Sequence, residues 1–105
     1  MSRVHDARHL AFIRQLPCIT CRNPHETEAC HIRYSDARYG KVNPGIGKKP
    51  DDKYTLPMCG RCHRRQHAGN ERNFWLLHQI DPIGTALELY NVSGNIELAM
   101  KILQK

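Results

Sequence analysis

MCGRCHRRQH at residues 58–67 holds two cysteines, Cys59 and Cys62, that are separated by two residues. PCITC at residues 17–21 holds a second pair with the same spacing, Cys18 and Cys21. This spacing lets a tight turn direct both thiolates at one tetrahedral ion, and two such pairs complete a site with four cysteine ligands. The sequence therefore predicts one structural zinc ion that joins two distant parts of the chain.

Disulfides, a redox pair and unligated thiols are the other interpretations of these cysteines. Residues 1–17 lack the long uncharged segment of a secretory signal, so we expect a cytoplasmic protein, in which disulfides are rare. A redox Cys-x-x-Cys is expected inside a βαβ pattern, and none surrounds either pair. Unligated thiols packed in the core remain the alternative. We expect the fifth cysteine, Cys30, to be a small buried residue.

Length and charge restrict the class of protein further. The 105 residues suit one small domain, and no apolar run approaches the roughly 20 residues of a membrane span. The net charge is +6, and the excess lies in residues 1–65, which hold thirteen basic and six acidic side chains. A field of this sign suits a polyanion such as nucleic acid, although a solvated basic surface is the alternative.

Periodicity and capping signals predict an α+β fold in a single domain, residues 1–105. Zinc is expected to pin a core of residues 17–69, with helical flanks at residues 1–16 and 70–105. We predict strands at residues 28–34 and 53–57, joined by a loop at 35–52. The predicted helices cover residues 3–15, 61–68, 70–78 and 82–90, and a last one that begins after Ser93 or Asn95 and reaches about 103.

Three histidines have positions that favour chemistry. His63 and His67 are four residues apart on one predicted helix, so they share a face and have room for one ion between them. His31 lies on the first predicted strand, and we expect zinc to bring all three imidazoles to a common pocket. For the other histidines we predict ordinary surface positions: His5, His9, His25 and His78. Phe74, Trp75 and Leu77 are predicted to be core.

Two strands followed by a helix, with a histidine on the first strand and two on the helix, form a ββα-metal arrangement. The chain here resembles the HNH, or His-Me finger, endonucleases. The resemblance covers about residues 10–90, and it is nearest to small phage and prophage members, including relatives of the recombination-enhancement nuclease. The residues that carry it are ACHIR at 29–33, GIGKKPDD at 45–52 with the strand after it, and MCGRCHRRQH at 58–67.

The resemblance implies a role for each matching residue. His31 matches the general base that takes a proton from water, and imidazole titrates in the range that this task requires. His63 matches a helix ligand of a catalytic divalent ion, expected to be Mg²⁺ or Mn²⁺, and His67 matches a second ligand found in some members. The zinc ion would be structural only.

The chain departs from the family pattern at two positions. Cys30 stands where an aspartate or histidine ligand is usual, and a thiolate is a poor ligand for Mg²⁺. This change leaves three alternatives: the metal is softer, another carboxylate takes the place of the missing ligand, or activity is impaired. Asp36 and Asp52 are the candidate substitutes, and Asp52 is favoured. The middle asparagine of the family has no clear match, and Asp52, which lies nearest that place, is expected to hold the loop or orient His31.

The sequence thus predicts a metal-dependent DNA endonuclease with little sequence specificity. The basic residues that flank the proposed site could contact phosphates, although each is individually explained as a solvated charge: Arg33, Lys48, Lys49, Arg64 and Arg65. Two alternatives remain open. One is a zinc-stabilised DNA-binding module without activity, and the other is a phage accessory factor that binds a recombination protein.

Overall fold

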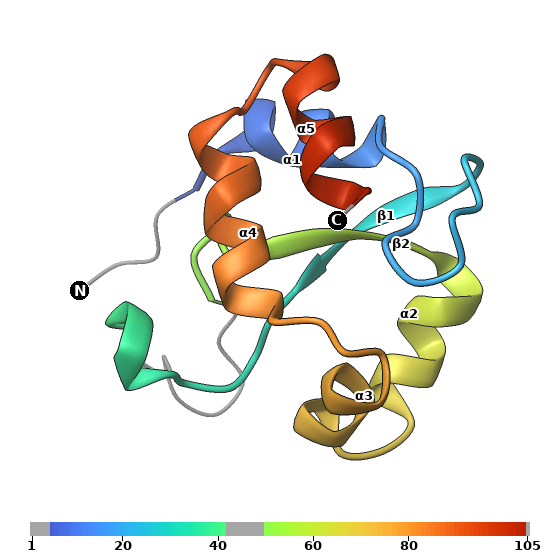
Figure 1. The fold of residues 1–105 in the computed structure, drawn as a ribbon, viewed down its shortest axis with the longest axis vertical. Coiled ribbons are helices and arrows are strands. Elements are labelled where there is room, and N and C mark those ends of the chain that lie inside the picture. Colours follow the sequence, from blue (N-terminus) through green and yellow to red (C-terminus); the bar gives the residue numbers. More distant parts are fainter. Residues whose placement is uncertain (1–4, 42–49, 105) are drawn as a thin grey trace.

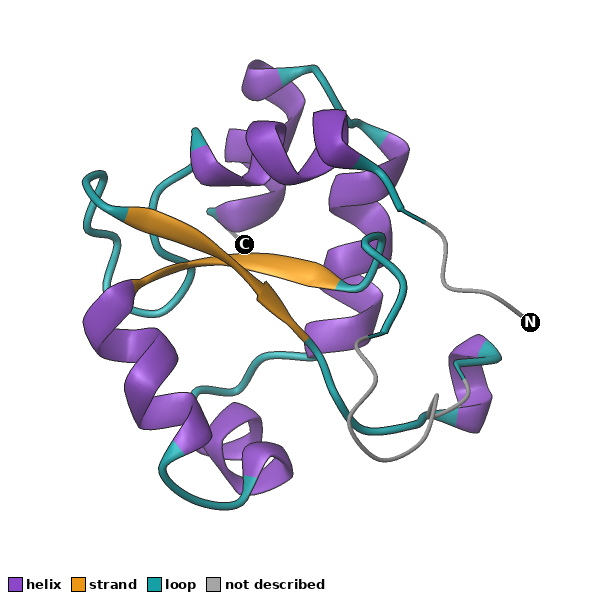
Figure 2. Ribbon diagram, turned by 180° about the vertical axis from the view of Figure 1, so that it is seen from behind, coloured by secondary structure: helices purple, strands orange, loops and turns teal. Residues whose placement is uncertain are grey.

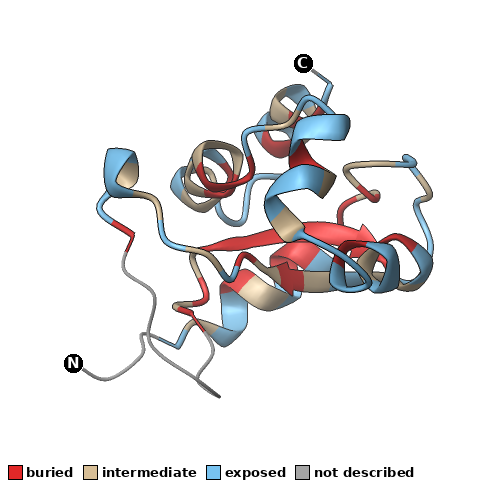
Figure 3. Ribbon diagram, turned by 90° about the horizontal axis from the view of Figure 1, so that it is seen from below, coloured by how far each residue is buried: buried red, intermediate tan, exposed pale blue. Residues whose placement is uncertain are grey.

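An antiparallel pair of strands lies at the centre of the computed structural model, which describes residues 5–41 and 50–104. Strand β1 (Thr27–His31) pairs with β2 (Thr55–Cys59) in a register that sets Thr27 opposite Cys59 and His31 opposite Thr55. All five residues of β2 are buried, because helices cover both faces of the sheet (Figure 3). This strand is therefore the middle of the core.

The described residues contain five α-helices: α1 (Ala7–Arg14), α2 (Gly60–His67), α3 (Glu71–Leu77), α4 (Pro82–Asn91) and α5 (Ile96–Leu103). A 3₁₀ turn, η1 (Ala37–Tyr39), follows β1. Helices α1, α4 and α5 lie on one side of the sheet, and α2 and α3 lie on the other (Figures 1 and 2). The predicted α+β class is confirmed. No helix within the described ranges has both the length and the apolar character needed to cross a bilayer.

Side-chain caps set the helix starts. Asp6, Asn70, Asp81 and Asn95 each accept a hydrogen bond from the main-chain N–H three residues further on. Such a bond satisfies one of the amides that a helix leaves unpaired at its first turn. The starts predicted at Asn70 and Asp81 are confirmed, and Asn95 rather than Ser93 opens the last helix. Helix α1 begins later than predicted because Asp6 caps it.

The strands are shifted from their predicted ranges. The first ends at His31 rather than at residue 34, because the Arg33 N–H turns away to bond the carboxylate of Glu71 on α3. The second begins at Thr55 rather than at residue 53, after a turn that the bond from Tyr54 N to the Asp51 carbonyl closes. Its shift makes Cys59 the last strand residue, so helix α2 follows the sheet without a connecting loop.

Two burial predictions are wrong. Leu77 is 83% exposed, whereas Trp75 is buried as predicted. Trp75 packs in the hydrophobic core, and position 77 lies about 200° further round this short helix. His9 was expected on the surface but is fully buried on α1, where its ring meets that of Tyr90 edge-on with centroids 4.8 Å apart. Residues 45–49 of the predicted loop motif lie outside the described residues, whereas its residues 50–52 are described.

Candidate functional site

The four cysteines predicted to bind zinc come together. Their sulfurs all lie within 4.8 Å of one another, and the Cys21 and Cys59 sulfurs are 3.6 Å apart. A tetrahedral zinc ion with Zn–S bonds of about 2.3 Å sets its ligands about 3.8 Å apart, so the cluster fits one ion. It is the only such group of three or more donor side chains in the described part of the chain, and Cys30 does not belong to it.

The local environment favours a thiolate at Cys18. Burial acts to raise the pKa of this thiol, but hydrogen bonds from the Thr20 hydroxyl and from the backbone of Cys21 and Cys59 outweigh burial and lower the pKa to about 6. A thiolate is the form that binds metal. The loop around it is tied to β2, because Ile19 N donates to the Pro57 carbonyl at 2.8 Å. The backbone therefore holds the two cysteine pairs together.

His31 lies at the end of β1 and contacts a buried carboxylate. Its Nε2 is 2.9 Å from Oδ1 of Asp52, whose side chain is only 2% exposed. The second oxygen of Asp52 accepts the main-chain N–H of Asp6 at 2.7 Å. The imidazole itself is 12% exposed, so solvent reaches it. A carboxylate held in this way fixes the orientation of an imidazole, which is the arrangement expected of a general base.

Of the two candidate carboxylates, only Asp52 reaches His31. Asp36 instead caps η1 and binds the guanidinium of Arg38, with an N–O distance of 2.7 Å. The hydrogen bond that Arg38 donates is the main reason why the pKa of the Asp36 carboxyl lies below its ordinary value. The predicted neighbourhood of His31 and Asp52 is thus confirmed as a contact.

His63 and His67 form a pair on the exposed side of α2. Their Nε2 atoms are 2.9 Å apart, and Nδ1 of His63 lies 2.7 Å from Oε1 of Glu28 on β1. Burial, followed by the nearby His63 and Arg33, lowers the pKa of His67, which keeps a lone pair available for a ligand. Two imidazole nitrogens this close together could bind one divalent ion between them.

Glu28 is the site residue that the sequence analysis missed. A carboxylate bound to the second nitrogen of a metal-binding histidine orients the ring and raises its basicity. Strand periodicity could have predicted it. Residues two apart on a strand share a face, and Glu28 is two residues before Cys30, the position at which the family has a metal ligand. The chain therefore places a carboxylate beside His63 even though position 30 is a cysteine.

Cys30 itself behaves as a core residue. It is fully buried, and burial, followed by the charge of Glu71, raises the pKa of its thiol to about 12. A thiol in this state stays neutral and packs as a small apolar group. The structure therefore does not favour a metal bound to Cys30, and the predicted substitute ligands, Asp52 and Asp36, bond His31 and Arg38 instead of the histidine pair.

The structure brings together two of the three imidazoles. Because side chains alternate along a strand, Glu28 faces α2, whereas His31 faces the side on which Asp6 caps α1. Among the described residues, the ring nitrogens of His31 do not form a group within 4.8 Å with those of His63 and His67. The single pocket expected around all three rings thus divides into two places, one on each face of β1.

Three of the predicted phosphate contacts are exposed side chains on the surface: Arg33, Arg64 and Arg65. Arg64 and Arg65 lie on α2 with the histidine pair, and Arg33 is near enough to His67 to affect its pKa. Lys48 and Lys49 lie outside the described residues. Positive charge is therefore present on the helix that carries the histidine pair and, through Arg33, close to His67.

Comparisons with protein-family models, with curated proteins and with solved structures give no match to this chain.

Proposed function

We propose that this protein is a metal-dependent DNA endonuclease of the HNH type, in which β1, β2 and α2 form the ββα-metal finger. The observation that carries the proposal is that β1 contributes to both kinds of group that hydrolysis needs, which lie on its two faces and would act on one phosphate at the end of the strand. Its end presents His31 against the buried Asp52, and its other face presents Glu28 against the His63–His67 pair. Hydrolysis of a phosphodiester needs both a base and a centre of positive charge.

In the proposed reaction, His31 takes a proton from water while the water oxygen bonds to phosphorus and the bond from phosphorus to the leaving 3′ oxygen breaks. Asp52 holds the imidazole in place, because its other oxygen is fixed by the Asp6 N–H. His63 and His67 would hold one divalent ion, which supplies positive charge to the phosphate oxygens and the leaving group. The resemblance implies Mg²⁺ or Mn²⁺ for this position, and Ni²⁺ belongs in the same comparison because imidazole nitrogens bind it more readily.

The four-cysteine cluster holds the structural Zn²⁺ in this proposal. Sulfur fills all four positions, so the ion has no open position for water or substrate. Its role is to anchor the first turn of α2, because Cys62 directly precedes His63. Zinc thereby fixes where the histidine pair stands relative to β1.

DNA is the favoured substrate because the site is basic. The chain carries +6, and exposed arginines lie beside the histidine pair. Contacts of arginine with phosphate position a nucleic acid without reading its sequence, so we expect low sequence specificity.

Nicking of supercoiled plasmid tests the proposal. Wild-type protein is incubated with Mg²⁺, Mn²⁺ or Ni²⁺ beside the variants His31→Ala and His25→Ala. His25 is an exposed histidine outside the site and is the matched control. We expect at least one metal to support nicking, His31→Ala to lower it by about 100-fold or more, and His25→Ala to leave it unchanged.

The proposal fails if no metal supports nicking by wild type above that of His31→Ala. In that event, a gel shift that persists in the variant and weakens with added salt identifies a DNA-binding module instead. Circular dichroism and zinc content of each variant show that the comparison is between folded proteins.

A further inference from the structure

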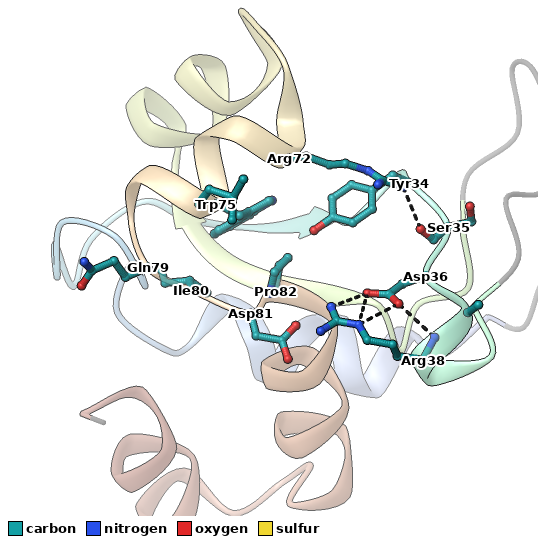
Figure 4. Close-up of a pocket in the computed structure, with 12 residues that line it drawn as sticks. Tyr34, Ser35, Asp36, Arg38, Arg72, Trp75, Gln79, Ile80, Asp81 and Pro82 are labelled. Carbon is teal, nitrogen blue, oxygen red and sulfur yellow. Dashed lines mark hydrogen bonds and ion pairs between the residues drawn. The ribbon is translucent and has the colours of Figure 1, made fainter.

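A cavity of about 680 Å³ lies beside the segment that leaves β1. Its walls come from residues 34–38, from α3 and from the turn between α3 and α4 at residues 79–82 (Figure 4). Small-ligand sites have volumes of roughly 300–1,000 Å³, so the space suits a small molecule or one unit of a polymer. Neither histidine of α2 lines it, and it is separate from the site described above.

A stacked pair of side chains forms one wall. The guanidinium of Arg72 lies 4.8 Å from the centroid of the Tyr34 ring, and its Nη2 donates to the Ser35 carbonyl at 3.2 Å. Figure 4 shows both side chains at the same side of the cavity. A guanidinium over an aromatic ring offers a surface on which a nucleobase can stack.

The acidic side chains of the cavity are already bonded. Asp36 binds Arg38, and Asp81 accepts hydrogen bonds from the Tyr39 hydroxyl and from Gly84 N. The charge of Asp36 is therefore offset by Arg38, whereas Asp81 bonds only neutral groups and keeps its charge. Arg72 likewise bonds a neutral carbonyl, so its positive charge is available to a ligand. This charge lies beside the Tyr34 ring, where the phosphate next to a stacked base could meet it.

The stack is also tied to the strand that carries His31. Arg33 N donates to both oxygens of Glu71, at 3.2 and 3.3 Å, and these two residues immediately precede Tyr34 and Arg72. The cavity thus continues the path of β1 beyond its histidine. Leu76, which is 73% exposed, adds an apolar edge to the lining.

We propose that this cavity receives an unpaired nucleotide of a DNA strand, with its base stacked on the Arg72–Tyr34 pair. The inference depends on the proposed action on DNA and deepens it by naming the substrate class: single-stranded or frayed DNA in preference to an intact duplex. A base within a duplex is covered by its neighbours and has no free face to offer the stack.

The chain's only tryptophan provides the test, because Trp75 lines this cavity. Zinc-loaded protein without added divalent metal is titrated with a short single-stranded oligonucleotide and with the blunt duplex of the same sequence, and Trp75 fluorescence is recorded. We expect the single strand to change the fluorescence at lower concentration than the duplex. Arg72→Lys keeps the charge and loses the planar group, so it should weaken single-strand binding about tenfold, and Tyr34→Ala should do the same.

Arg14→Lys, at an exposed position at the end of α1, is the matched control and should bind like wild type. The inference is overturned if Arg72→Lys binds as tightly as wild type, or if duplex and single strand bind equally. Plasmid nicking separates this inference from the proposed function. If the protein nicks plasmid and Arg72→Lys binds single strands as tightly as wild type, the cavity proposal alone fails. If binding depends on Arg72 but no nicking occurs, the proposed hydrolysis fails and the cavity proposal is supported.

Discussion

Asp6 donates its main-chain N–H to Oδ2 of Asp52 at 2.7 Å, although 46 positions separate the two residues. The Asp6 side chain also caps α1 through His9 N and accepts the Tyr90 hydroxyl at 3.3 Å. One residue therefore links the first helix, the fourth helix and the carboxylate beside His31. The orientation of the proposed base depends on packing of the N-terminal helix, which lies outside the zinc-pinned segment.

Replacing Asp52 tests this link. Asp52→Asn keeps the size of the side chain but removes the charge that faces His31, so we expect plasmid nicking to fall about tenfold or more. Asp52→Ala should in addition destabilise the protein by about 1–3 kcal/mol, because buried hydrogen-bonding groups lose their partner. Glu97→Gln, at an exposed position of α5, is the control. Equal activity of Asp52→Asn and Glu97→Gln would contradict the assigned role of Asp52.

Zinc content distinguishes the four clustered cysteines from the fifth. Cys59→Ser removes one of the four sulfurs and should abolish the tightly bound zinc together with cooperative unfolding, because metal binding and folding are coupled. Cys30→Ala should keep one zinc per chain and cost only about 1–2 kcal/mol, the loss of a buried sulfur. Elemental analysis and thermal melts measure both. Loss of zinc from Cys30→Ala would show that the cluster has been assigned wrongly.

Glu28 is predicted to support metal binding through His63. Glu28→Gln leaves His63 without a charged partner at Nδ1, so the Mn²⁺ concentration for half-maximal nicking should rise about 10- to 100-fold. Glu26→Gln, two positions earlier and exposed, is the control and should not change it. The same Mn²⁺ dependence in wild type and Glu28→Gln would remove Glu28 from the site. Calorimetric titration of Mn²⁺ checks the effect without turnover.

Burial of His9 makes stability depend on pH. Burial lowers the pKa of this imidazole below its ordinary 6.5, outweighing the charges of Asp6 and Asp52 that raise it. The unfolded chain then binds the proton more tightly, so the contribution of His9 is present above pH 6.5 and is lost as the pH falls further. The loss is at most about 1.4 kcal/mol per pH unit. His9→Phe cannot titrate and should lose less stability than wild type between pH 7.5 and pH 5.5.

Denaturant unfolding at the two pH values measures this difference. Acid also weakens zinc thiolates in both proteins, and comparison of the two cancels that effect. Parallel losses in wild type and His9→Phe would show that His9 contributes nothing to the pH dependence. The unpartnered Nε2 of His9 in the described structure agrees with a ring that stays neutral.

Local patterns account for what could be predicted. Helix starts at Asn70 and Asp81 follow from bonds to amides three residues on, and the Cys-x-x-Cys pairs follow from the reach of a tight turn. The His63–His67 pair follows from helix periodicity, and the structure brings it together as expected. These interactions span at most four residues, so the sequence around them contains the information.

The burial of His9, the exposure of Leu77 and the place of Glu28 required the fold. Each depends on which element packs against which, and a pattern within one element does not contain that information. Sheet register directs Glu28 toward α2 and His31 toward the opposite face, and a shift of one residue would exchange them. The amino-acid sequence by itself determined the ligand types and their spacing. Tertiary packing alone decided which carboxylate meets which imidazole, because those contacts join residues 21 and 35 positions apart.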